Sequence, residues 1–159
     1  MPVVMEMTFR EYRAGDAAVF RRLNEEWIAK YFFLEEKDIE ILTDPERHIL
    51  QPGGAIYFAT RDAEILGCCA LIVNGPGSYE LAKMAVREDL RNQGIGRALL
   101  AHVIESARKK GARKVTLETS SKLTNAIHVY ELSGFVHVDP AEHEPSPYQR
   151  ANVFMEMLL

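Results

Sequence analysis

Two glycines at the predicted start of a helix are the residues best placed to do chemistry in this sequence. They lie in the segment Arg91-Asn92-Gln93-Gly94-Ile95-Gly96-Arg97, which follows a predicted strand and opens a helical pattern. The first amides of a helix have no partners within the helix and carry partial positive charge. Glycines let a bulky anion approach those amides without interference from side chains. The segment therefore predicts a phosphate site.

Three phosphate-binding motifs compete for this segment. A P-loop requires Gly-Lys-Ser/Thr, whereas Arg97 and Ala98 follow Gly96. A dinucleotide-binding fingerprint requires a third Gly or Ala at the position of Leu99, and no βαβ unit opens the chain. The remaining pattern, Arg/Gln-x-x-Gly-x-Gly/Ala, matches at every position from Arg91 to Gly96.

Hydrophobic periodicity around this segment predicts one mixed α/β domain over 1–159, with a core from about residue 8. Strands are predicted over 8–12, 55–60, 65–73, 79–86, 114–118, 135–138 and 152–158. Helices are predicted over 16–31, 35–43, 44–50, 94–110 and 124–132, with Asp16 and Thr124 as N-caps. The charged run at 35–38 reads as a solvated helix face.

With this order of elements, the chain resembles the GCN5-related N-acetyltransferase (GNAT) superfamily. The resemblance covers nearly the whole chain. It is carried by the glycine motif, the strand after it, and a late helix with Asn125, Ala126 and Tyr130 that ends at Gly134-Phe135. It implies a mixed α/β fold, with a mostly antiparallel sheet of about seven strands between helices and with strands 4 and 5 splayed apart. It also implies acetyl-CoA as co-substrate and transfer of its acetyl group to an amine, without a metal.

The resemblance places the pantetheine arm along the strand at 81–86 and the diphosphate on the amides around Gly94. The implied cofactor-binding residues are Met84, Ala85, Val86, Arg91, Asn92, Gln93, Gly94, Ile95, Gly96, Arg97, Asn125 and Tyr130. For Arg91 and Arg97 the alternative is a solvated surface arginine. For Asn125 the alternative is a polar residue at a helix start.

Attack of an amine on a thioester requires three groups: a hydrogen-bond donor to the oxyanion that forms, an acid for the leaving thiolate, and a base for the amine. A backbone amide near Ala85 or Val86 meets the first requirement. The resemblance implies Tyr130 as the general acid for the departing thiolate, with a tyrosine that only packs against the cofactor as the alternative. Glu80 and Glu118, at strand ends beside the expected cleft, are the candidate bases, although exposed glutamates are common.

The acceptor site is predicted from Glu26, Tyr31, Tyr148 and Arg150. Tyr31 lies on the apolar stripe of its helix, so a core position is its alternative. Arg150 is suited to clamp a carboxylate, which favours an amino-acid-like acceptor, or it pairs with a surface glutamate. The predicted function is acetylation of a primary amine of a small molecule. The alternative is a non-catalytic acyl-CoA-binding or sensing domain, and the resemblance makes a homodimer an expectation.

Composition narrows the classes of partner. The formal net charge of −4 argues against a nucleic-acid binder. The adjacent Cys68 and Cys69 are read as small apolar residues of a buried strand, which favours a reducing, cytoplasmic setting. No apolar stretch approaches the roughly 20 residues that span a bilayer, and the five histidines show no metal-ligand spacing. We therefore expect no membrane partner and no metal.

Overall fold

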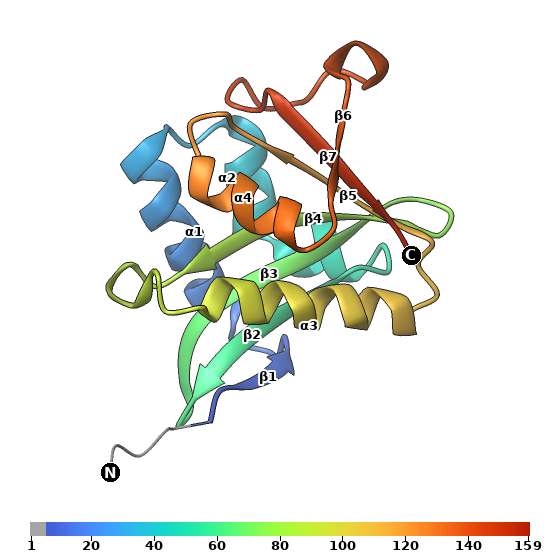
Figure 1. Ribbon diagram of the computed structural model, residues 1–159. Coiled ribbons are helices and arrows are strands. Elements are labelled where there is room, and N and C mark those ends of the chain that lie inside the picture. Colours follow the sequence, from blue (N-terminus) through green and yellow to red (C-terminus); the bar gives the residue numbers. More distant parts are fainter. Residues whose placement is uncertain (1–5) are drawn as a thin grey trace.

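One sheet of seven strands organises the computed structural model, which describes residues 6–159 (Figure 1). The strand order is β1-β2-β3-β4-β5-β7-β6, and every neighbouring pair is antiparallel except β4–β5. The strands are β1 (Thr8–Glu11), β2 (Ala55–Arg61), β3 (Glu64–Gly75), β4 (Ser78–Val86), β5 (Lys114–Thr119), β6 (Val136–Val138) and β7 (Val153–Leu158). The predicted fold class is confirmed.

Helices cover both faces of the sheet. One face carries α1 (Ala17–Tyr31) and α2 (Glu36–Thr43), and the other carries α3 (Ile95–Lys109) and α4 (Thr124–Leu132). Three short helical turns are η1 (Glu46–Leu50), η2 (Glu88–Leu90) and η3 (Pro140–Glu142). Asp16 is the N-cap of α1 as predicted, whereas Leu123 rather than Thr124 is the N-cap of α4. The helix predicted over 44–50 is a single π-helical turn, η1.

The core forms two apolar layers, one on each side of the sheet. The α3 layer contains the stripe read from the sequence, with Leu99, Leu100 and Val103 fully buried. The other layer packs α1 and α2 against β2 and β3. Cys68 and Cys69 are both free thiols without a disulfide and are 0% exposed, so the interpretation as small buried residues is confirmed.

The parallel pair β4–β5 separates partway along its length. Its register runs only through Ser78–Lys114, Tyr79–Val115 and Glu80–Thr116. Beyond Glu80, β4 continues to Val86 paired with β3 alone. The two strands are therefore splayed as predicted, and the backbone of the second half of β4 is left open on its β5 side.

A β-bulge distorts the open half of β4. Cys68 pairs with Ala85 and Ala70 pairs with Ala82, so Lys83 and Met84 together oppose a single β3 residue. Lys83 has a φ of 54°, in the left-handed region that residues other than glycine rarely adopt. Such bulges re-aim side chains and are frequent beside active sites. Here the bulge changes the direction of the chain where β4 borders the gap.

Candidate active site

The N-terminus of α3 lines the same cavity as the open half of β4 and the end of β5. Gly94 is the N-cap, with a φ of 80°, and no side chain caps the helix. The first hydrogen bond of the helix runs from the Ala98 amide to the Gly94 carbonyl, at 3.0 Å. A Cβ at Gly94 would meet nothing within 4 Å, and one at Gly96 would meet only Val86 Cγ2, at 3.6 Å. The helix mouth is therefore a bare surface of amides.

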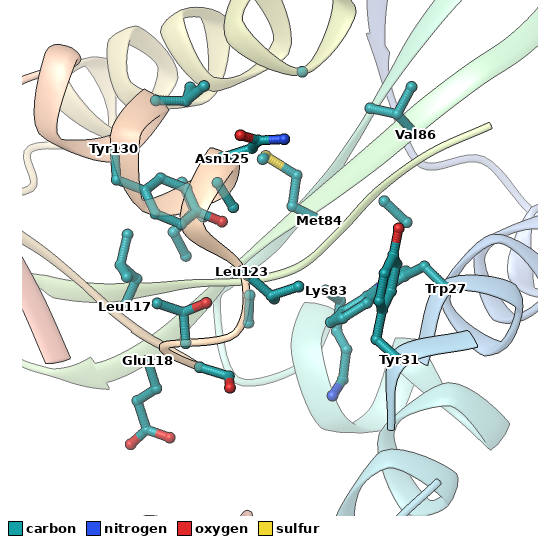
Figure 2. A pocket seen from close by; sticks show the side chains of 18 of the residues that line it. Trp27, Tyr31, Lys83, Met84, Val86, Leu117, Glu118, Leu123, Asn125 and Tyr130 are labelled. Atoms are coloured by element: carbon teal, nitrogen blue, oxygen red, sulfur yellow. The ribbon is translucent and has the colours of Figure 1, made fainter. Parts of the chain in front are cut away.

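A cavity of about 690 Å³ runs from this helix mouth along β4 to the loop over 143–152 between η3 and β7, called the C-terminal loop below. Figure 2 shows its walls, with Tyr130 and Asn125 from α4 facing Trp27 and Tyr31 from α1 across Met84 and Val86 of β4. Two predicted site residues, Gln93 and Glu26, do not line it. The predicted residues that do are Tyr31, Glu80, Met84, Ala85, Val86, Arg91, Asn92, Gly94, Ile95, Gly96, Arg97, Glu118, Asn125, Tyr130, Tyr148 and Arg150.

Tyr130 presents a phenol to the middle of this cavity. Its ring is buried and packs edge-on against Phe135, with 6.0 Å between centroids. Its hydroxyl points toward the space between α4 and β4 (Figure 2). Burial raises the pKa of Tyr130 well above the ordinary value of a phenol. The group therefore remains protonated, and a hydrogen-bond donor, throughout the neutral range.

Glu80 lies where β4 and β5 part, because it belongs to the last register pair. Burial, together with the negative charge of Glu118, raises the pKa of Glu80 to about 7. Glu118 is held differently, since its Oε2 accepts a hydrogen bond from Ser146 Oγ at 2.6 Å. The two candidate bases thus both line the cavity, and Glu80 gains or loses its proton near neutral pH.

Arg150 is engaged by carboxylates of the chain itself. Its Nη1 and Nη2 each donate to Asp38 at 2.7 Å, and Nη1 also donates to Glu35 at 3.2 Å. The guanidinium lies over the Tyr148 ring, 4.5 Å from the centroid. Arg150 was expected either to clamp a substrate carboxylate or to pair with a surface glutamate. In the structure it pairs with acids of the chain, and these acids are largely buried rather than on the surface.

Asp38 and Lys83 are central to the site and were missed by the sequence reading. Asp38 was assigned to a solvated helix face, which is wrong because its side chain is 0% exposed. Its spacing held the signal, since it stands three and four positions before the buried Ile41 and Leu42 on α2. Lys83 alternates along β4 with the buried Leu81 and Ala85, but its charged side chain gave no indication that it would be buried too.

Known proteins share this architecture. Residues 17–135 match the model of the acetyltransferase (GNAT) family. An uncharacterised N-acetyltransferase of Escherichia coli, YjgM, is 30% identical over 148 residues, which cover 88% of this chain and 85% of that protein. A GNAT-family acetyltransferase from Staphylococcus aureus superposes with a TM-score of 0.86 at 22% identity, covering 96% and 99% of the two chains.

A second solved structure contains a ligand. An acetyltransferase of Bacillus subtilis in complex with CoA superposes with a TM-score of 0.74 at 18% identity, covering 97% of this chain and 99% of that chain. Among residues 6–159, no group of three or more His, Cys, Asp or Glu side chains is arranged to hold a metal ion. No helix in the same range is long and apolar enough to cross a membrane.

Proposed function

Because the chain belongs to the acetyltransferase (GNAT) family and is an acetyltransferase, we propose that it moves the acetyl group of acetyl-CoA to the primary amine of a small molecule. One observation carries the proposal. A single cavity joins the bare mouth of α3, the unpaired edge of β4, a buried phenol and a carboxylate that titrates near pH 7.

Acetyl-CoA fits the two backbone features of this cavity. The diphosphate would lie on the amides around Gly94 and Gly96, where no side chain stands in the way. The pantetheine arm would run along the open half of β4 and take the place of a paired strand beside Met84, Ala85 and Val86. The CoA complex of the Bacillus subtilis acetyltransferase supports this choice of ligand.

Transfer begins when the amine nitrogen bonds to the thioester carbon and its positive charge must be relieved by loss of a proton. An alkylamine has a pKa of ~10.4, so a base is needed. Glu80 is the proposed base, because a pKa of about 7 leaves much of it ionised at neutral pH and still able to hold a proton. Glu118, fixed by Ser146, contributes negative charge beside it.

The carbonyl oxygen becomes negative in the same step, and a backbone amide near Ala85 or Val86 is the proposed donor to it. When the carbon–sulfur bond breaks, the electron pair stays on sulfur. Tyr130 is the proposed acid that meets this thiolate, since its phenol remains protonated in the cavity. An acceptor that arrives as an ammonium ion gives up two protons in all, one of which is released to solvent and one of which balances the proton that Tyr130 gives to sulfur, and the products are an amide and free CoA.

The charge of the acceptor end favours a cationic amine. Of its basic side chains, Lys83 and Arg150 are bound to Asp38 and Lys122 lies over the Phe32 ring, whereas Glu80 and Glu118 line the cavity. Tyr31 and Trp27 add aromatic faces that attract cations. We therefore propose amines without a carboxylate as better acceptors than amino acids.

The test measures release of free CoA thiol from acetyl-CoA with a panel of diamines, monoamines and amino acids. The expected result is release that depends on the acceptor, with one acetyl group found on the amine by mass spectrometry. Binding of CoA without acceptor-dependent release of thiol from any amine would overturn the proposal.

A further inference from the structure

Lys83 is a buried cation at the point where β4 bulges into the cavity. Its side chain is 5% exposed, and its backbone holds a φ of 54°. A left-handed φ at a residue other than glycine is maintained only where surrounding contacts fix it. A lysine at this depth also requires a partner for its charge. Both conditions point to the groups that contact its ammonium.

Three contacts fix the ammonium. Its Nζ lies 2.6 Å from Asp38 Oδ1 on α2 and 3.0 Å from the Tyr148 hydroxyl oxygen. It also lies 4.6 Å from the centroid of the Tyr148 ring. Asp38 is itself held by four donors, because Arg150 and the Glu35 amide bind it as well. Lys83 therefore joins the bulge to α2 and to the C-terminal loop.

This network extends to Glu118, one of the two candidate bases, and includes Lys83 on the same strand as Glu80, the other. From Tyr148, a hydrogen bond runs from the backbone amide to Ser146 Oγ, which donates to Glu118. Glu80 lies on that strand three residues before Lys83, separated from the bulge by two residues that pair with β3. The cofactor strand, α2, the C-terminal loop and Glu118 thus share one connected set of hydrogen bonds, and Glu80 lines the same cavity as Lys83 and Tyr148.

We propose that Lys83 is a positioning residue for acetyl transfer: its ammonium, pinned by Asp38 and Tyr148, locks the bulge of β4 and holds a fixed positive charge beside Glu80. The proposal rests on the assignment of Glu80 as the base. Lys83 has no contact with the reacting atoms in this scheme. It acts through the carboxylate and through the shape of the strand.

The charges around Glu80 define the expected effect. Burial and Glu118 on β5 raise its pKa, while Lys83 on β4, His143 on the C-terminal loop and Lys37 on α2 lower it. Tyr148 faces the same space as a neutral phenol, because burial raises its pKa. Of the groups that lower the pKa of Glu80, Lys83 has the largest effect. Loss of its charge raises the pKa of Glu80 further.

The experiment compares pH profiles of kcat/KM for the wild type, Lys83→Met, Lys83→Arg and the control Lys109→Met, an exposed lysine at the end of α3. Methionine keeps the apolar stem and removes the charge. We expect the acidic limb of Lys83→Met to move up by about one unit, which lowers the rate at pH 6 about tenfold. We expect Lys83→Arg to restore most of the wild-type profile and Lys109→Met to match it.

Glu80→Gln, alone and combined with Lys83→Met, shows whether the acidic limb of the kcat/KM profile is the titration of Glu80. An acidic limb that moves in Lys83→Met but is absent from both Glu80→Gln proteins supports the proposal. An unmoved limb in an active, folded Lys83→Met protein overturns it and leaves the proposed function intact. If Lys83→Met does not fold, Lys83→Gln takes its place, because it removes the same charge but keeps a hydrogen-bond donor for Asp38 and Tyr148, and an unchanged limb there overturns the proposal. A wild type without acceptor-dependent thiol release would instead reject the proposed function.

Discussion

Substitution of Gly94 by alanine tests the proposed phosphate cradle directly. Gly94 has a φ of 80°, and an added methyl group would meet no protein atom within 4 Å. The cost in the free protein is therefore backbone strain alone, about 1–2 kcal/mol for a left-handed residue with a side chain. In a protein of this length that cost lowers Tm by roughly 2–8 °C.

Gly111 provides a matched control within the same protein. It follows α3 at the opposite end, has a φ of 84°, and an added Cβ would likewise meet nothing within 4 Å. It does not line the cavity. Gly111→Ala should therefore lose the same stability as Gly94→Ala, and any difference in ligand binding between the two variants comes from the helix mouth.

The expected difference is large. The new methyl group at Gly94 would stand over the amides that receive the diphosphate, and a lost hydrogen bond to a charged group costs about 1.5–3 kcal/mol. Calorimetry should thus show a Kd for CoA weakened roughly 10- to 150-fold in Gly94→Ala and unchanged in Gly111→Ala. Acetyl-pantetheine lacks the diphosphate and should show no such difference in KM. Equal CoA affinities in the two variants would refute the phosphate cradle.

Three further substitutions test the chemistry and the buried cluster. Tyr130→Phe should lower kcat by roughly 100- to 10,000-fold with little change in the Kd for CoA, and a wild-type kcat would remove the acid role. In Glu80→Gln the rise of kcat/KM up to a pH of about 7 should disappear, and a pH profile that still rises assigns it to another group. Asp38→Asn should lower the free energy of unfolding in urea by about 3–5 kcal/mol, because Lys83 and Arg150 lose their shared anion. Burial alone would raise the pKa of Asp38, but those cations hold it at about 2, so this stability is present above a pH of about 4 and is lost as the pH falls toward 2.

Local patterns were enough to predict the parts of the fold that depend on neighbours in sequence. The apolar stripe of α3 and the glycines at its mouth are short-range signals, and the structure places them where the sequence did. The splayed strands followed from the family resemblance rather than from any spacing of residues. The structure shows where the strands part, because the register of β4 and β5 stops after Glu80 and Thr116.

Contacts between distant segments could not be predicted in this way. Lys83 and Asp38 are 45 positions apart, and Asp38 and Arg150 are 112 positions apart. Nothing in the local sequence of α2, β4 or the C-terminal loop specifies that their charges meet. The sequence therefore left Arg150 open as a clamp for substrate or as a partner of a surface glutamate, whereas the structure pairs it with the buried Asp38 and with Glu35. The raised pKa of Glu80 is hidden for the same reason, since it requires both burial and the approach of Glu118.

Burial acts on the two proposed proton carriers in the same direction and prepares them for opposite roles. In both groups desolvation disfavours the anion and raises the pKa. For a carboxyl group this brings titration up to neutral pH, where Glu80 can accept a proton from a reacting amine. For a phenol it moves titration further from neutral pH, so Tyr130 keeps the proton that a departing thiolate needs. In the proposed mechanism, burial in one cavity between parted strands therefore prepares both the base and the acid, and the buried Lys83 keeps the pKa of Glu80 from rising so far that the carboxylate is no longer ionised at neutral pH.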